Sequence, residues 1–93
     1  MSVTAGGGGG SPAVGPRVTR VKIKGTKKFY VYGENFSANS VIRLNGVNLA
    51  PKSFEGDLNS ARLYFKGRLG LGPSGTNVVV ILNNIGTSQP YNF

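Results

Sequence analysis

The sequence predicts an all-β protein, built as an antiparallel sandwich or a small barrel of about seven short strands. Three observations lead to this prediction. Apolar and polar residues alternate with period two in several short segments. Turn-forming residues recur between these segments. No stretch shows the sustained 3.6-residue period of an amphipathic helix, and many short strands in a small domain favour two packed sheets or a barrel.

The N-terminal residues 1–16 differ in composition from the rest of the chain. They carry no charged side chain and include the run Gly6–Gly10 together with Pro12 and Pro16. This composition is typical of a flexible tail or linker, because it offers almost no apolar surface to bury. We therefore expect one folded domain over residues 17–93, which suits a chain of 93 residues in total.

The first two predicted strands are Arg20–Lys24 and Lys28–Tyr32, separated by Gly25-Thr26. In the first strand, basic residues alternate with two aliphatic residues, so the bases share one face of the strand and the aliphatic side chains share the other. The sequence Gly33-Glu34-Asn35 then predicts a turn.

A tight hairpin is the next predicted element. Its strands are Val41–Leu44 and Val47–Leu49, joined by Asn45-Gly46. Asn-Gly suits a type I′ turn, because both central residues of that turn need a positive φ angle. Pro51 ends the second strand of the hairpin.

Three further strands complete the predicted sheets. Ala61–Phe65 and Asn77–Leu82 are rich in alternating or β-branched residues, and the loop Gly67–Gly75 separates them. The turn Asn83–Gly86 leads to a last strand, Thr87–Phe93. We expect Phe36 to fold back into the core against neighbouring strand residues. The remaining inward positions are predicted to be Ile42, Leu44, Leu63, Phe65, Val79 and Ile81.

Four short motifs follow one another along the folded part: Pro16-Arg17-Val18-Thr19-Arg20-Val21, Phe29-Tyr30-Val31-Tyr32-Gly33-Glu34-Asn35-Phe36, Ile42-Arg43-Leu44-Asn45-Gly46-Val47, and finally Gly75, Val79-Val80-Ile81-Leu82-Asn83, Gly86 and Ser88. In order and spacing they resemble the IPT/TIG family of immunoglobulin-like domains. The resemblance covers about residues 16–93. It implies an immunoglobulin-like (E-set type) antiparallel β-sandwich of about seven strands.

The same resemblance implies a non-catalytic spacer, scaffold or protein-interaction module. Its partners would be neighbouring domains or another protein, and it would belong to a larger bacterial surface or secreted protein. We accordingly expect an extracellular or cell-surface location. The absence of cysteine is also compatible with the cytosol.

Composition makes an enzyme an unattractive interpretation. The chain has no histidine, no cysteine and only three acidic residues, so the usual general bases, thiol nucleophiles and metal ligands are missing or scarce. We expect no catalytic residue, no metal site and no cofactor. No apolar run approaches the roughly 18 residues of a spanning helix, so we expect no membrane insertion.

The strongest candidate site is the basic first strand. Eleven Lys and Arg residues stand against three Asp and Glu, and the formal net charge is +8. Such a charge attracts nucleic acids and acidic polysaccharides. The candidate polyanion-binding residues are Arg20, Lys22, Lys24 and Lys28. The alternative is that these bases only protect a sheet edge from pairing with other chains and keep the domain soluble.

Two tyrosines and one arginine are further candidates. Tyr30 and Tyr32 would share the outward face of the second strand, where aromatic rings could stack on bases or sugars. A carbohydrate-binding accessory domain is therefore a further hypothesis, and the alternative is simple packing under the side-chain stems of Lys22 and Lys24. Arg68 could act as a contact in the Gly67–Gly75 loop, whose leucines would otherwise tuck under the sheets.

Overall fold

The computed structural model describes residues 15–93 of the chain. Within this range all regular elements are β-strands, and none is a helix. The predicted linker over residues 1–16 therefore lies outside the described residues except for its last two. The strands, in chain order, are β1 (Arg17–Lys24), β2 (Lys28–Glu34), β3 (Val41–Leu44), β4 (Val47–Leu49), β5 (Ser53–Gly56), β6 (Ala61–Lys66), β7 (Val78–Leu82) and β8 (Tyr91–Asn92).

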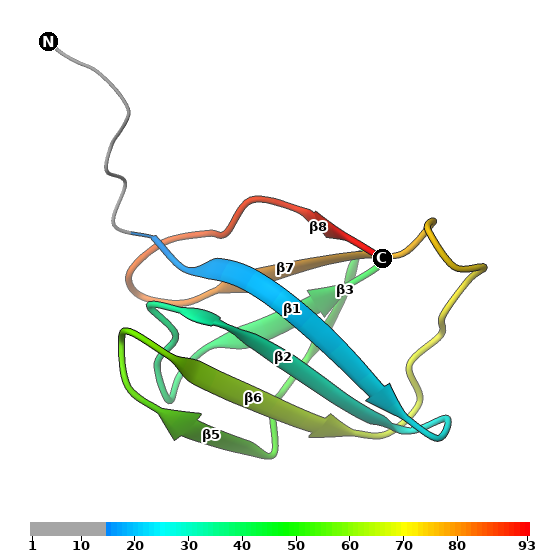
Figure 1. Cartoon of the computed structure of the whole chain (residues 1–93), viewed down its shortest axis with the longest axis horizontal. Coiled ribbons are helices and arrows are strands. Elements are labelled where there is room, and N and C mark those ends of the chain that lie inside the picture. The colour runs from blue at the N-terminus through cyan, green and yellow to red at the C-terminus, as the bar shows by residue number, and fades with distance from the viewer. Residues whose placement is uncertain (1–14) are drawn as a thin grey trace, which may run out of the picture.

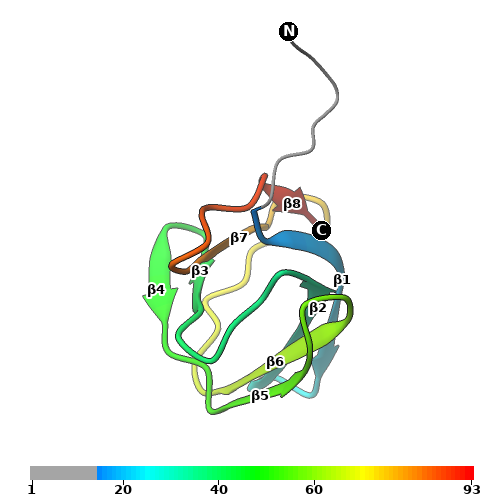
Figure 2. The same ribbon diagram turned by 90° about the vertical axis from the view of Figure 1, so that its left-hand side faces the viewer.

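The strands form two four-stranded antiparallel sheets, in the orders β1-β2-β6-β5 and β4-β3-β7-β8. Figure 1 shows the first sheet in front of the second, and the turned view in Figure 2 shows them as two layers. β1 and β5 are the edges of the first sheet, whereas β2 and β6 are its inner strands. The predicted all-β fold with antiparallel sheets is confirmed.

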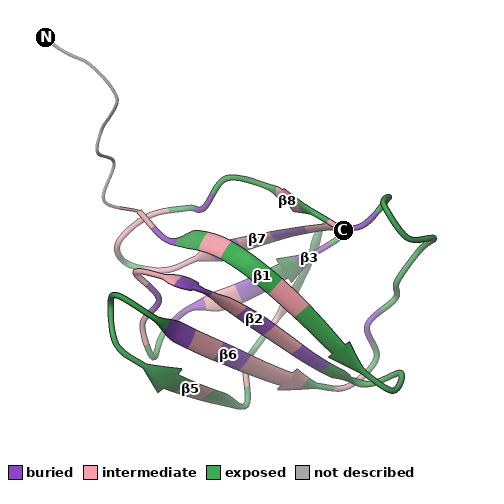
Figure 3. Cartoon of the chain, in the orientation of Figure 1, coloured by how far each residue is buried: buried purple, intermediate pink, exposed green. Residues whose placement is uncertain are grey.

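Side chains from both sheets meet in one hydrophobic core. Buried and half-buried residues alternate along β2, as Figure 3 shows, because successive side chains point to opposite faces of a strand. The prediction for Phe36 is confirmed, since it is fully buried in the same cluster as Phe29 and Val31. Phe65 is half-buried against that cluster. The other predicted inward residues are buried, namely Ile42, Leu44, Leu63, Val79 and Ile81.

Gly33 belongs to strand β2, so the predicted turn at residues 33–35 is wrong for its first two positions. A Cβ atom on Gly33 would lie 2.0 Å from the carbonyl oxygen of Arg17 and 2.6 Å from the ring of Phe36. Glycine is therefore required here for close packing inside a strand. The chain leaves the sheet two residues later at Asn35, whose φ angle is +59°.

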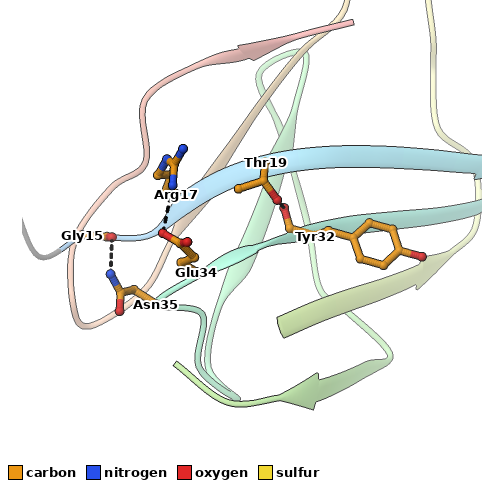
Figure 4. A network of polar contacts seen from close by, with 6 residues as sticks. All are labelled: Gly15, Arg17, Thr19, Tyr32, Glu34 and Asn35. Atoms are coloured by element: carbon orange, nitrogen blue, oxygen red, sulfur yellow. Dashed lines mark hydrogen bonds and ion pairs between the residues drawn. The ribbon is translucent and has the colours of Figure 1, made fainter. Parts of the chain in front are cut away.

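β1 contains an irregularity that the alternating sequence does not reveal. Its pairing with β2 shifts between Val18 and Arg20, so Thr19 is an extra residue in the strand. The hydroxyl of Thr19 donates a hydrogen bond to the carbonyl oxygen of Tyr32 at 3.2 Å, as Figure 4 shows. Because of this bulge, Val18 faces the core while Arg17 and Arg20 both face outward.

The predicted hairpin between β3 and β4 is confirmed. Asn45 and Gly46 have φ angles of +50° and +85°, as a type I′ turn requires. The side chain of Asn45 also accepts a hydrogen bond from the amide of Val78 and donates one to the side-chain oxygen of Asn77. The turn is thereby tied to the start of β7.

The predicted last strand, Thr87–Phe93, is too long. Only Tyr91–Asn92 forms a strand, and Thr87 makes a single bridge with Leu82. Between them, the hydroxyl of Ser88 accepts the hydrogen bond from the amide of Ile81, which a continuous strand would satisfy through its backbone. Pro90 then has no amide hydrogen to donate to a ladder.

Strand β5 was not predicted. It pairs with β6 and places Phe54 opposite Leu63. Its sequence, Ser-Phe-Glu-Gly, holds one apolar residue, which is too short a pattern to show a period of two.

Gly15 and Pro16 of the predicted linker contact the folded part, since Gly15 accepts a hydrogen bond from the side chain of Asn35 (Figure 4) and Pro16 is buried.

Replacing Gly33 with alanine tests the close packing at this position. We expect Gly33→Ala to destabilise the protein by about 2–4 kcal/mol or to prevent folding, because the added methyl group meets backbone atoms that cannot move away cheaply. Gly86→Ala is the matched control, because its added methyl group meets no atom closer than 3.7 Å. Urea denaturation measures both variants, and equal stability of the two would contradict this packing.

Removing the ring of Phe36 tests the core. We expect Phe36→Ala to lower the free energy of unfolding by about 3–5 kcal/mol, because a large buried side chain leaves a cavity. Phe36→Leu should cost clearly less, and it remains measurable if the alanine variant does not fold. A melting temperature of Phe36→Ala equal to that of the unchanged protein would show that Phe36 is not a core residue.

Candidate basic face

The register of the first sheet gathers basic and aromatic side chains on its outer face. Residues opposite one another in antiparallel strands point to the same side of the sheet. Across β1, β2, β6 and β5, the outward rows are Lys24–Lys28–Lys66, Lys22–Tyr30–Tyr64–Ser53, Arg20–Tyr32–Arg62–Glu55 and Arg17–Glu34. We call the Lys, Arg, Tyr and Glu residues of these rows the basic face.

The basic face holds seven of the eleven Lys and Arg residues and two of the three acidic residues. All four predicted polyanion-binding residues lie on it, and three of them come from β1. The outer side of the second sheet is different, since the basic residue in its paired rows is Arg43, which donates a hydrogen bond to Asn48 at 3.0 Å. Positive charge is therefore concentrated on one side of the molecule.

Only part of this charge lies at a sheet edge. The basic residues of β1 are on an edge strand, as the edge-protection interpretation requires. Lys28, Arg62 and Lys66 are on the inner strands β2 and β6. Edge protection does not explain these three residues.

One row places three lysines directly opposite one another. Lys24 pairs with Lys28, which pairs in turn with Lys66. Like charges at directly opposite positions destabilise a sheet. The three lysine side chains are exposed, so water and salt weaken this repulsion without removing it.

The tyrosine rings contact one another and two guanidinium groups. Tyr30 stacks on Tyr64 with ring centroids 4.9 Å apart, and the guanidinium carbon of Arg62 lies 5.3 Å from the centroid of Tyr30. The guanidinium carbon of Arg20 lies 4.3 Å from the centroid of Tyr32. Tyr30 and Tyr32 are half-buried, so their rings form part of the surface while packing against neighbours.

Tyr32 lies between two arginines, and its ionisation reflects them. Desolvation raises the pKa of its phenol group, but hydrogen bonding to Arg62 and Arg20 and the positive charges of both outweigh that effect. The pKa of Tyr32 is therefore lowered from its ordinary value of 10.0. Arg20 lies over the ring of Tyr32, and Arg62 is its direct cross-strand partner on β6.

The acidic residues of the basic face each pair with an arginine. Glu34 accepts a hydrogen bond from Arg17 at 3.1 Å, and both side chains are well exposed (Figure 4). Glu55 pairs with Arg62. Exposed pairs of this kind add little to stability, and a ligand can displace them at small cost.

Sequence reasoning missed Arg62, Tyr64, Lys66 and Glu55. The alternation of Arg62, Tyr64 and Lys66 with apolar neighbours could have shown that β6 has a polar face. The sequence does not tell which strand lies beside β2, so these residues could not be joined to the tyrosines. The sequence predicted that the side-chain stems of Lys22 and Lys24 cover Tyr30. In the structure, the ring of Tyr30 packs against the guanidinium group of Arg62 and the ring of Tyr64.

The other candidate contact, Arg68, lies apart from the basic face. It is exposed in the segment between β6 and β7. Leu69 beside it is buried and belongs to the core, whereas Leu71 is 37% exposed. One leucine therefore tucks under the sheets, as the alternative interpretation proposed, and the other does not.

A groove of about 320 Å³ lies between the start of β1 and the segment that leads into β8. Its charged lining residue is Arg17, and Glu34 already pairs with that side chain. Over residues 15–93, no three acidic, histidine or cysteine side chains gather where a metal ion could bind. The same range has no helix long and apolar enough to cross a membrane.

No protein-family model matches this chain, and no curated protein or solved structure is significantly similar to it. The comparisons therefore add no evidence on family or activity. The residues of the basic face are the remaining guide to function.

The environment of Tyr32 predicts an early alkaline titration. We expect its phenol to ionise below pH 10.0, and Arg62→Gln to raise its pKa, because one positive neighbour is lost. The unfolded chain then holds this proton to higher pH than the folded protein. Ionisation of Tyr32 therefore adds to stability as the pH rises through the folded pKa. Tyrosine NMR titration checks this, and an unchanged Tyr32 pKa in Arg62→Gln would contradict it.

Proposed function

We propose that this chain is a non-catalytic binding module whose basic face holds an anionic polysaccharide. The observation that carries the proposal is the row Lys24–Lys28–Lys66, which crosses from the edge strand to the inner strands. A row of like charges costs stability in the free protein. A polymer with regularly spaced anionic groups neutralises several of these charges at once.

The dimensions of the basic face suit a linear polymer. From Arg17 to Lys24 the face extends for about 20 Å, given the rise of an extended strand. Neighbouring strands are about 5 Å apart, so cations follow one another at short intervals in both directions. A chain lying along β1 and β2 meets several cations within a few repeat units.

The state of the tyrosine rings favours a polysaccharide over a nucleic acid. Proteins that bind single-stranded nucleic acids offer free aromatic faces on which bases stack. Tyr30 is engaged by Tyr64 and Arg62, and Tyr32 is engaged by Arg20. The charged groups of the basic face are better placed to serve as contacts than the ring faces. Sulfate and carboxylate groups on a sugar chain need such charged donors and no stacking.

A second candidate is a spacer or scaffold module in a larger bacterial surface or secreted protein, with neighbouring domains as partners. Gly15 lies by Asn35 near the end of β7, whereas Phe93 exchanges backbone hydrogen bonds with Asn77 before its start. The described chain thus enters and leaves at opposite ends of the sheets (Figure 1), which suits domains joined end to end. Two facing four-stranded sheets also support an immunoglobulin-like (E-set type) fold of the IPT/TIG kind.

Both candidates are compatible with an extracellular or cell-surface location, where anionic polysaccharides and multidomain proteins meet. They differ in what the exposed lysines do. A spacer has no need of Lys28 and Lys66 on inner strands, whereas a binding module uses them.

Charge removal at matched positions tests the proposed function. We expect the double variant Lys24→Gln/Lys28→Gln to bind a heparin-derived oligosaccharide about tenfold more weakly at low salt. Its affinity should also fall less steeply with salt, because fewer counterions are released on binding. Calorimetric titration at several salt concentrations measures both effects, and thermal melting confirms that the exposed substitutions leave the fold intact.

The control removes two positive charges elsewhere, in Arg43→Gln/Arg68→Gln. Both residues are exposed and outside the basic face. We expect less than a twofold change in affinity. Equal losses in the two double variants would mean that only net charge matters, and absence of binding by the unchanged protein would favour the spacer.

A further inference from the structure

The row Arg20–Tyr32–Arg62 differs from the lysine row of the basic face. Its residues come from three adjacent strands, in the order β1, β2 and β6. The guanidinium carbon of Arg20 lies 4.3 Å from the Tyr32 ring centroid. Arg62 is the direct cross-strand partner of Tyr32 on β6, the strand on the other side of β2 from β1. One phenol therefore has an arginine on each flank.

We propose that Arg20, Tyr32 and Arg62 form an anchoring subsite for one sulfate or carboxylate group of the polysaccharide, and that Glu55 competes with the ligand for Arg62. This inference rests on the proposed function. The chemistry of the donors supports it, since planar guanidinium groups bind oxyanions through two parallel hydrogen bonds. The hydroxyl of Tyr32 adds a neutral donor between them.

Contacts within the row and with the neighbouring row hold these donors in place. Arg20 packs on the ring of Tyr32, and Arg62 packs near the ring of Tyr30. An arginine that already lies on an aromatic ring loses less side-chain freedom when it binds an anion. Lys24, Lys28 and Lys66 are exposed point charges on flexible side chains, so they supply attraction over a distance rather than a fixed geometry.

Glu55 gives the subsite a built-in competitor. Its carboxylate pairs with Arg62 at the end of the same row. The side chains are 61% and 36% exposed, so this pair is weak and can open when a ligand arrives. The carboxylate of Glu55 also repels an approaching anion. An acidic residue at this position therefore lowers the affinity of the free module.

Replacing an arginine with lysine separates the geometry of the subsite from its charge. Arg62→Lys keeps the charge but removes the planar fork, so we expect about fivefold weaker binding of a heparin-derived tetrasaccharide with little change in salt dependence. Arg43→Lys is the matched control, because it makes the same substitution at an exposed residue outside the basic face, and it should bind within twofold of the unchanged protein. Equal affinity of the two variants would overturn the subsite.

Removing the charge of Glu55 should strengthen binding, whereas Arg62→Lys should weaken it. Glu55→Gln keeps the size of the side chain but not its charge, and we expect about threefold tighter binding of the same tetrasaccharide. The control is Glu34→Gln, which frees Arg17 outside the row and should have a smaller effect. If Glu55→Gln does not bind more tightly than Glu34→Gln, Glu55 is not a competitor.

The choice of probe separates the ligand groups and the polymer classes. A heparin-derived tetrasaccharide carries sulfate and carboxylate groups, and an oligogalacturonate carries carboxylates alone. The Arg62→Lys loss should appear with whichever group occupies the subsite. Tighter binding of an oligothymidylate of equal charge than of either sugar would overturn the polysaccharide assignment.

The outcomes also distinguish the subsite from the proposed function. Binding that depends on Lys24 and Lys28 but not on the fork of Arg62 would overturn the subsite and leave the basic face as the binding surface. Binding by no variant and no probe would overturn both. A shift of the Tyr32 ring signals on addition of the tetrasaccharide, lost in Arg62→Lys, would support the subsite directly.

Discussion

The register between β1 and β2 is the constraint on which the rest of this structure depends. It is held where the carbonyl of Arg17 and the ring of Phe36 occupy the space beside Gly33 that a side chain would fill. Side chains alternate along a strand, so a slip of one residue would turn the apolar residues of β2 outward and bury its tyrosines. The buried ring of Phe36 and the exposed basic face are therefore two results of one alignment.

This alignment gives the first sheet two faces of different composition. Its inner face contributes Phe29, Val31 and Leu63 to a core shared with the second sheet. Its outer face carries most of the positive charge, and in one of its rows three lysines stand side by side. A fold that needed only solubility would gain more from mixing both signs of charge. The unfavourable arrangement is what makes an anionic ligand a reasonable partner.

Local signals in the sequence were sufficient for much of the fold. Asn45-Gly46 predicted its turn because few residue pairs adopt two positive φ angles, and the alternation around Phe29 predicted a strand with one buried face. Strand β5 was not predicted because its four residues include one apolar side chain, which shows no period of two. Gly33 was read as a turn residue because the sequence does not show that a ring and a carbonyl would crowd it.

Only part of the candidate site could be predicted from the sequence. The basic residues of β1 and the tyrosines of β2 are neighbours along the chain, and a hairpin brings them together. Arg62 and Tyr64 join them because β6 pairs with β2 across a long stretch of sequence, and nothing local fixes that partner. The sequence therefore indicated a stripe on one strand, whereas the fold assembles a face from four strands.

The most direct test of this account is an amide chemical-shift titration of the labelled protein with a heparin-derived oligosaccharide at near-physiological salt. The account predicts shifts concentrated in β1, β2 and β6, with little change in β3 and β7. It also predicts that these shifts saturate with a single affinity. Shifts spread evenly over both sheets, or shifts that disappear at that salt concentration, would contradict it.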